Sequence, residues 1–228
     1  SAVRNMSFSM YWKSLENRCF LFVLFFGLVI TFLSLYSLDQ ETHFLDKFRT
    51  VAFNVISIAT TTGYATYDYG QWPPIAFSIM LLLSCFSTCS GSTGGGVKMI
   101  RVIIMFKQAG RELSRTMHPH AIIPLSIGET TVANKVVLAV LAFMFFYLVT
   151  LLVTLFLLMA TGLSAGTALS ASLACLNNLG PALFELGPTS NYGTLSEFQL
   201  LILSVAMLLG RLELLTIFVF FSGAFWKK

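Results

Sequence analysis

The sequence predicts an all-α integral membrane protein made of two hairpin repeats, each with two spans that flank a pore loop. Of the 228 residues, 56% are hydrophobic and 11% are charged, and the mean hydropathy of +0.80 excludes a soluble domain. A long apolar run, a short apolar run and a polar loop with glycine occur twice in the same order. The segment LLLS at 81–84 recurs as LILS at 201–204, and Gly63 and Gly180 lie 117 residues apart. Each unit has two spans, so both copies share one orientation, unlike the inverted repeats of many transporters.

The first repeat begins with a basic segment and a full span. Residues 1–18 are polar and basic, and residues 19–38 form a charge-free apolar run of 20 residues, the length of a transmembrane helix. After an acidic loop, apolar residues recur at helical spacing over 48–59, with Thr42 and Asp46 upstream as start signals. This short helix covers about 18 Å against about 30 Å of hydrocarbon, so we expect a half-helix that ends inside the membrane.

The polar loop after this half-helix predicts a cation selectivity filter. Thr61, Thr62, Gly63 and Tyr64 offer consecutive carbonyls and hydroxyls, which suit a dehydrated cation. Gly63 can take a backbone conformation that a β-carbon forbids. The negative end of the half-helix dipole also favours a cation at this point. Irregular backbone at this depth is tolerated only where it lines water or is buried in protein, and an ordinary buried turn is the alternative.

A glycine-rich segment breaks the second span of this repeat. Trp72 and two prolines mark the membrane interface, and a helix from Ile75 stays apolar to Phe86. Three consecutive glycines then cost about 1 kcal/mol each relative to alanine, before an apolar and basic segment follows over 97–107. We predict a mobile intramembrane loop that lines an aqueous cavity, with a passive helix kink as the alternative. A phosphate-binding loop is excluded because Val97 intrudes before the lysine and no Ser or Thr follows. The predicted gating residues are Ser90, Gly91, Ser92, Thr93, Gly94, Gly95 and Gly96.

A polar, basic linker joins the two repeats, so the predicted units are 1–107, 108–134 and 135–228. Neither the histidines of this linker nor the four cysteines predict a metal site. His118 and His120 have no third ligand nearby, which favours a solvated loop. The cysteines lie in apolar surroundings without metal-ligand spacing, so we expect buried thiols and no disulfide.

The second repeat follows the same order of elements. A span over 136–160 leads through a turn at 161–167 to a second half-helix at 168–176. This half-helix is rich in alanine and serine, which suits close packing against neighbouring helices. The second predicted filter follows it and consists of Asn178, Leu179 and Gly180.

The last helix carries a charge at membrane depth. A capping box of Thr194 and Glu197 predicts a helix over about 195–226. Arg211 lies about 24 Å into this helix, where a charge must face a partner or water. Glu213 is two residues further on and points away from it. One interpretation is a structural ion pair with another helix. The other is a positive charge in the ion path below the filters, which opposes cation passage.

The distribution of charge predicts the orientation in the membrane. Of the 14 Lys and Arg residues, 11 lie before the first span, between the repeats or after the last span, so we expect both termini to be cytoplasmic. Six of the ten acidic residues lie on the opposite side, where both filters open. Acidic loops there raise the local cation concentration at the mouth.

Taken together, the motifs resemble the Trk/Ktr/HKT superfamily and are most similar to its TrkH-type bacterial potassium uptake subunits. They are TTGY at 61–64, GSTGGGVK at 91–98, NLGP at 178–181, GRLE at 210–213 and FWKK at 225–228. The resemblance implies four hairpins around one pore, of which this chain matches the third and fourth. This chain would then be a C-terminal half. Ser1 is not an initiator methionine and no cleavable signal precedes the first span, so a longer protein is expected.

The resemblance also implies a function and partners. It implies a potassium-selective filter, an intramembrane gating loop at the glycine-rich break and a gating arginine at Arg211. The second filter departs from the potassium-channel pattern, with Asn178 and Leu179 in place of Thr-Val and Pro181 in place of the aromatic residue. Homodimerisation in the bacterial inner membrane and a cytosolic nucleotide-binding regulatory subunit, TrkA, are implied as well. The implied potassium ligands are Thr61, Thr62, Gly63, Asn178, Leu179 and Gly180.

The predicted function is therefore potassium transport across the lipid bilayer, with no enzyme activity, no organic cofactor and no nucleic-acid partner. Two other classes stay open. A secondary symporter that couples cation entry to protons or sodium needs acidic residues inside the spans, and only Glu213 qualifies. A non-conducting assembly subunit that packs beside a pore is the other.

Overall fold

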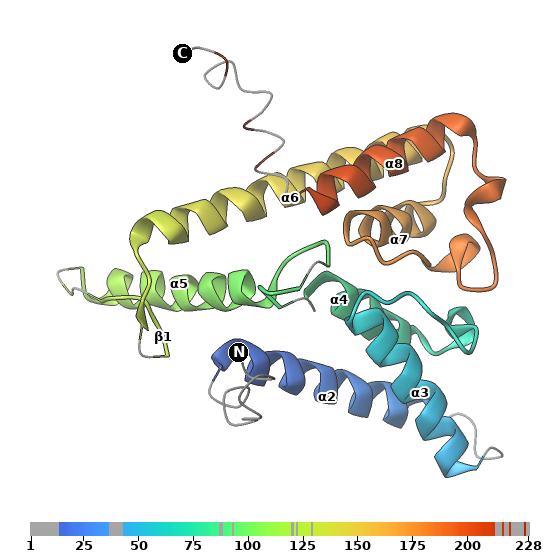
Figure 1. The fold of residues 1–228 in the computed structure, drawn as a ribbon, viewed down its shortest axis with the longest axis horizontal. Coiled ribbons are helices and arrows are strands. Elements are labelled where there is room, and N and C mark those ends of the chain that lie inside the picture. Colours follow the sequence, from blue (N-terminus) through green and yellow to red (C-terminus); the bar gives the residue numbers. More distant parts are fainter. Residues whose placement is uncertain are drawn as a thin grey trace, which may run out of the picture.

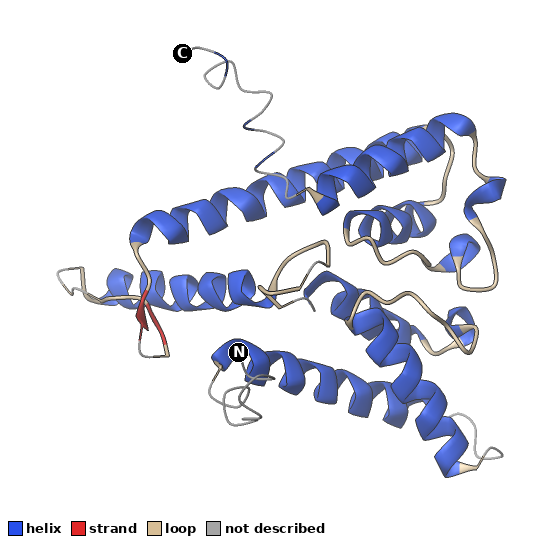
Figure 2. Ribbon diagram, in the orientation of Figure 1, coloured by secondary structure: helices blue, strands red, loops and turns tan. Residues whose placement is uncertain are grey.

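The computed structural model describes residues 14–36, 43–86, 89–92, 94–119, 121, 123–128 and 130–212, with single residues at 216, 219 and 226. Helices dominate these residues, and two short strands pair as a hairpin (Figures 1 and 2). The α-helices are α2 (Leu15–Tyr36), α3 (Phe44–Ala59), α4 (Pro74–Phe86), α5 (Met99–Met117), α6 (Asn134–Ala160), α7 (Ala165–Leu176) and α8 (Glu197–Arg211). The 3₁₀ turns are η1 (Tyr69–Gln71), η2 (Phe184–Leu186) and η3 (Tyr192–Thr194), and the strands are β1 (Ser126–Ile127) and β2 (Thr130–Thr131).

Two helices are long and apolar enough to cross a membrane, α2 with 22 residues and α6 with 27. They correspond to the spans predicted at 19–38 and 136–160, and each begins a few residues earlier than predicted. Shorter apolar helices, α4 and α7, lie between them in the chain. Large apolar side chains are exposed along both long helices, among them Phe22 and Phe145. Such surfaces suit lipid or a further transmembrane element rather than water.

Both predicted half-helices are present and end where predicted, but each starts earlier than predicted. The first, α3, begins at Phe44, because Asp46 lies inside its first turn and pairs with Arg49 at 3.1 Å instead of preceding the helix. The N-cap, His43, makes no side-chain capping hydrogen bond to the described residues, so the sequence offers no start signal there. The second, α7, begins at Ala165 because the Ser164 hydroxyl caps it.

The capping box predicted for the last helix was placed two residues too early. Thr194 belongs to the turn η3, and Leu195 after it is extended. Ser196 is the N-cap instead. Its hydroxyl accepts from the backbone N–H of Gln199, and its own N–H donates to Oε1 of Gln199 at 2.9 Å. The continuation of α8 towards Trp226 lies almost entirely outside the described residues.

The segment between the repeats has more regular structure than a solvated loop. Helix α5 runs on to Met117, past the predicted end of the first repeat at 107. A hairpin of two short strands, β1 and β2, then precedes α6. The Lys107 ammonium donates to the Ser126 carbonyl at 2.6 Å, and Arg111 donates to the Asn134 side chain at 3.0 Å. These bonds attach α5 to the hairpin and to the start of α6.

The helices form two groups that meet in the middle of the molecule. Helix α2 packs on α3 and α4, while α6 packs on α7 and α8, and α4 meets α7 between the groups. Figure 1 shows α6 and α8 side by side with α7 next to them. One buried cluster joins both groups and includes Val55, Ala76, Met80, Leu176 and Leu203. One continuous apolar core therefore includes residues of both half-helices, and the two groups meet where α4 packs on α7.

Gly210 lies where α8 touches the backbone of α7. A β-carbon at Gly210 would collide with the Leu176 carbonyl oxygen and lie 2.8 Å from its carbonyl carbon. Gly210→Ala is expected to destabilise the folded protein by about 2 kcal/mol, because backbone cannot move aside as a side chain can. At Gly110, in α5, nothing among the described atoms lies within 4 Å of the added carbon, so Gly110→Ala should be neutral or slightly stabilising. Melting temperatures of the two variants in detergent check this prediction, and equal values would contradict it.

Candidate cation pathway

The two half-helices end in turns of matching backbone conformation. Thr61 has φ 52° and Asn178 has φ 54°, a left-handed conformation that is uncommon outside glycine. Gly63 and Gly180 follow two residues later with φ 82° and 99°. All four positions match at the offset of 117 residues. The second predicted filter thus repeats the backbone of the first, although only the glycine is shared by both.

The amides of both turns point back into their own half-helices. The N–H of Thr61 donates to the Ile58 carbonyl at 3.1 Å, and that of Thr62 to the Ser57 carbonyl at 2.8 Å. In the second repeat, Asn178 donates to Cys175 at 3.1 Å and Leu179 to Ala174 at 2.9 Å, again at the same offset. In a trans peptide the carbonyl lies opposite the N–H. The carbonyls in the same peptides as these amides are those of Thr60, Thr61, Asn177 and Asn178. They therefore point away from the half-helices, where a cation can use them as ligands.

The two turns face each other across a narrow gap. A β-carbon at Gly63 would collide with the Leu179 carbonyl oxygen and lie 3.4 Å from Pro181 Cδ. A cavity of about 380 Å³ opens beyond this contact and is lined by Gly63, Tyr64, Gly180 and Pro181, together with the loop before α8. The structure thus brings the two predicted filters together at the floor of one vestibule.

Side-chain hydroxyls bond the outermost carbonyl of each turn. The Ser57 hydroxyl donates to the Tyr64 carbonyl at 2.6 Å, so this carbonyl is turned towards α3, while the Tyr64 side chain is exposed at the mouth. The Tyr192 hydroxyl donates to the Gly180 carbonyl at 2.9 Å. Burial raises the pKa of Tyr192, which keeps its proton in place as a donor. Neither Ser57 nor Tyr192 is marked by any motif.

The glycine-rich loop is attached at both of its ends. At its start, the Ser90 N–H and hydroxyl both donate to the Glu16 carboxylate, at 2.6 and 2.7 Å. At its end, a β-carbon on Gly95 would lie 2.8 Å from Nδ2 of Asn178, and one on Gly96 would collide with Oδ1 of Asn177. The loop therefore rests on the residues that begin the second filter. Thr93 lies outside the described residues.

Asn177 and Asn178 connect this loop to two spans. Asn177 is fully buried, and its Oδ1 accepts from the Tyr147 hydroxyl of α6 at 3.0 Å. Nδ2 of Asn178 donates to the Met207 carbonyl of α8 at 3.2 Å. The second turn is thus in contact with the loop, with α6 and with α8.

A second cavity, of about 320 Å³, lies on the inner side of the loop. Its lining includes Arg211 of α8 and the loop residues Ser92, Gly94 and Gly96. The structure therefore brings the predicted gating loop and Arg211 to one space. An alignment of the repeats on LLLS at 81–84 and LILS at 201–204 predicts that Gly91 lies opposite Arg211, but Gly91 is exposed and does not line this cavity.

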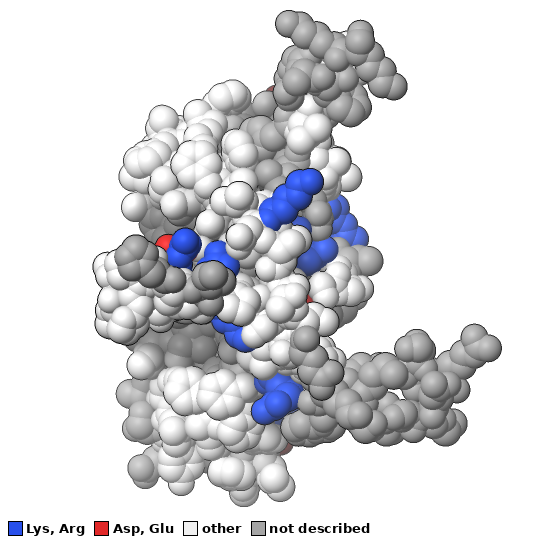
Figure 3. Space-filling view, turned by 90° about the vertical axis from the view of Figure 1, so that its left-hand side faces the viewer, with Lys and Arg blue, Asp and Glu red and all other residues white. Residues whose placement is uncertain are grey.

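Two further cations, Lys98 and Arg101, line the same cavity. The Arg101 guanidinium lies 3.9 Å above the ring of Phe143. Figure 3 views the end of the molecule where α5 ends and α6 begins, and blue Lys and Arg atoms far outnumber red Asp and Glu atoms on it. The described basic residues on α5 are Arg101, Lys107, Arg111 and Arg115.

No group of three or more His, Cys, Asp or Glu side chains converges as a metal site in the part of the chain that the structure describes. His118 is exposed at the end of α5, and His120 lies outside the described residues. Cys19, Cys85, Cys89 and Cys175 are all free.

Comparison with known proteins places the chain in a family. Residues 3–228 match the TrkH family, described as cation transport proteins. The Trk system potassium uptake protein TrkH of Halomonas elongata is 41% identical over 228 residues, which cover all of this chain and 46% of that protein. The TrkH protein of Escherichia coli K12 is 35% identical and is covered over 47% of its length. The crystal structure of the potassium transporter TrkH from Vibrio parahaemolyticus matches with a TM-score of 0.87 and 36% identity, over 95% of this chain and 46% of that one. The chain spans about half the length of these relatives.

These matches confirm the predicted family resemblance, the helical membrane fold and the expectation of a transport protein rather than an enzyme. They extend from near the first residue to the last, so they do not depend on any single motif. The chain belongs to the TrkH family of cation transport proteins.

Proposed function

We propose that this chain forms half of a potassium pore, in which backbone carbonyls of the two turns coordinate the ion. The observation that carries the proposal is the pair of matching turns, with their amides bonded to the half-helices and Gly63 set against the Leu179 carbonyl. Potassium as the ion is supported by the names of the relatives, which are a potassium uptake protein and a potassium transporter. The proposed ligands are Thr61, Thr62, Gly63, Asn178, Leu179 and Gly180.

The remaining wall of the pore is assigned to two further repeats of the same protein. The chain spans about half the length of its relatives, and each turn keeps exposed residues, Thr60 and Tyr64 in the first and Gly180 in the second. This chain is then the C-terminal half. The basic end seen in Figure 3 supports a cytoplasmic location for both termini in a bacterial inner membrane, with the filters opening outwards.

Closure of the pore is assigned to the glycine-rich loop and Arg211. Both line the cavity on the inner side of the filters, and the loop rests on Asn177 and Asn178. A cation that leaves the filters inwards must cross this cavity, where a guanidinium opposes it. The predicted gating set is Ser90, Gly91, Ser92, Thr93, Gly94, Gly95, Gly96 and Arg211.

Regulation is assigned to a cytosolic nucleotide-binding subunit of the TrkA type, acting on a homodimer. Helix α5 follows the loop directly and presents Lys107 and Arg115 on an exposed surface, so it is placed to pass a movement of the partner to the loop. No organic cofactor is proposed for this chain, and potassium is its cargo.

Ion flux through the full-length protein in proteoliposomes tests the proposal. We expect potassium flux to exceed sodium flux, to need neither a proton nor a sodium gradient, and to change when the soluble subunit is added. Equal potassium and sodium flux would remove the filter assignment. A strict requirement for a proton or sodium gradient would instead indicate the symporter class, and no flux in any condition a non-conducting subunit.

A further inference from the structure

Asn54 of α3 is a buried polar side chain that bonds the backbone beyond the first filter. It is fully buried, and its Oδ1 accepts from the Thr66 N–H at 3.2 Å. Its Nδ2 donates to the Thr66 hydroxyl at 3.0 Å and to the Thr50 carbonyl at 2.8 Å. Thr66 lies three residues after Gly63, on the segment that leads out of the filter. Asn54 thus attaches the segment after the filter to α3, the half-helix that precedes the filter.

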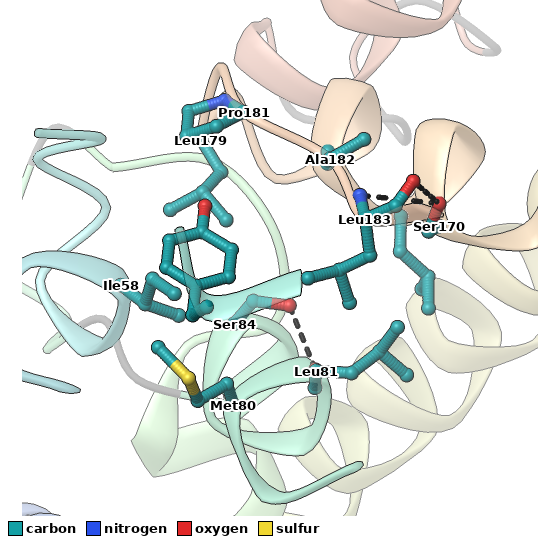
Figure 4. A pocket seen from close by; sticks show the side chains of 12 residues that line it. Ile58, Met80, Leu81, Ser84, Ser170, Leu179, Pro181, Ala182 and Leu183 are labelled. Atoms are coloured by element: carbon teal, nitrogen blue, oxygen red, sulfur yellow. Dashed lines mark hydrogen bonds between the residues drawn. The ribbon is translucent and has the colours of Figure 1, made fainter. Parts of the chain in front are cut away.

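Ser170 of α7 makes the corresponding connection in the second repeat. Its hydroxyl accepts from the Leu183 N–H at 3.4 Å and donates to the Leu183 carbonyl at 3.2 Å, as the dashed lines in Figure 4 show. Ser170 is 2% exposed, and Leu183 lines a small cavity between the repeats together with Met80 and Leu179. The hydroxyl also lies 3.1 Å from the Thr167 carbonyl of its own helix, so its one proton is shared between two carbonyls while its oxygen accepts from the Leu183 N–H.

The two bonded positions are equivalent, although the two side chains are not. Thr66 and Leu183 are related by the same offset of 117 residues as the filter glycines. At that offset Asn54 corresponds to Ala171, which has no polar side chain, and Ser170 corresponds to Phe53. Both repeats therefore bond the same point of the backbone with different residues one position apart on the half-helix. An incidental hydrogen bond would not be expected to fall on the equivalent residue in both copies.

This point matters for the ion because each turn is short. Its inner end is held by the backbone bonds to the half-helix, and only two residues lie between Gly63 and Thr66 and between Gly180 and Leu183. With both ends held, the carbonyls between them have little freedom to move towards or away from the axis. Discrimination between potassium and sodium depends on the number and placement of such carbonyls.

We infer that Asn54 and Ser170 are positioning residues, which set the geometry of the two filters from behind by fixing Thr66 and Leu183. The inference rests on the proposed function of the turns as filters. Neither side chain touches the ion. Each acts through the backbone that it bonds.

The test uses the full-length protein in proteoliposomes, with potassium and sodium fluxes measured on the same preparation. Asn54→Ala and Ser170→Ala should each lower the ratio of potassium to sodium flux roughly two- to tenfold, as expected for the loss of one to three buried hydrogen bonds. Thr66→Val removes one bond to Asn54 at an exposed residue and so avoids a folding defect; it should lower the ratio about twofold. A merely structural role would lower the amount of folded protein and leave this ratio unchanged.

Matched controls lie on the same two helices. Among the described residues, the fully buried Ser172 hydroxyl of α7 bonds only the Ala168 carbonyl of its own helix, and the half-buried Thr50 hydroxyl of α3 bonds only the Asp46 carbonyl. Ser172→Ala and Thr50→Ala should leave the flux ratio unchanged. Gly63→Ala could lower the potassium to sodium flux ratio while Asn54→Ala, Ser170→Ala and Thr66→Val do not. That result would overturn the positioning role of Asn54 and Ser170 and leave the filter assignment intact. If Gly63→Ala also has no effect, the filter assignment falls and the inference with it.

Discussion

Arg211→Ala in the full-length protein is expected to raise the basal cation leak from a few-fold to about two hundred-fold. A guanidinium about 5 Å from a passing cation costs that ion roughly 3 kcal/mol at an effective dielectric of 20, and under 1 kcal/mol in a fully wet cavity. The cavity of about 320 Å³ that Arg211 lines has room for several waters, so the lower half of this range fits the geometry better. Isotope efflux from proteoliposomes without the regulatory subunit measures the effect.

Two variants separate charge from packing in this experiment. Arg211→Lys keeps the positive charge and should leak far less than Arg211→Ala. Arg115→Ala removes an exposed arginine that pairs with Glu112 at 3.3 Å outside the cavity, and should leave the leak unchanged. If Arg211→Ala lowered the melting temperature without any added leak, the arginine would be a structural ion-pair member and the gate would lie elsewhere.

The second large effect is expected at Gly63. Gly63→Ala should lower the ratio of potassium to sodium flux by about ten- to a hundredfold, because two costs coincide there. Its φ of 82° is unfavourable for any residue with a β-carbon, and the added carbon would collide with the Leu179 carbonyl oxygen of the facing turn. The collision can be relieved only by moving one filter away from the other.

Other glycines allow the two costs at Gly63 to be separated. Gly180 has φ 99°, and nothing among the described atoms lies within 4 Å of an added β-carbon, so Gly180→Ala should affect the flux ratio less than Gly63→Ala. Gly128, in the turn of the hairpin, combines φ 61° with the same open space far from the filters, so Gly128→Ala should lower stability slightly and leave the ratio unchanged. Equal ratios for Gly63→Ala and Gly128→Ala would show that the facing carbonyl is not part of the pathway.

The spans and the ends of both half-helices were predictable because they rest on the length of apolar runs and on the glycines that follow them. The start of α8 was not, because Thr194 with Glu197 and Ser196 with Gln199 both fit a capping box, and only the tertiary position of Leu195 decides between them. The start of α3 at Phe44 has no side-chain cap among the described residues and thus no sequence signal.

Within the candidate site, the positions of the two turns that carry the predicted filters could be inferred from the sequence. The contacts that hold these turns could not. Glu16 reaches Ser90 across 74 residues, and the bond between Tyr147 and Asn177 joins α6 to α7. Such pairs have no periodic spacing that a single sequence reveals. The roles of Asn54 and Ser170 could not be predicted from the sequence either, because a polar residue on a short apolar helix also suits ordinary helix packing.

The separation along the chain of the bonds around each filter has a consequence for biogenesis. Asn54 and Thr66 are 12 residues apart, Ser170 and Leu183 are 13, and Ser57 and Tyr64 are 7, so these loops close with little entropic cost while a hairpin is being synthesised and inserted. Gly95 and Gly96, by contrast, contact Asn177 and Asn178, which are synthesised only with the second repeat. During synthesis the bonds around the first predicted filter can therefore form before the surface that receives the glycine-rich loop exists.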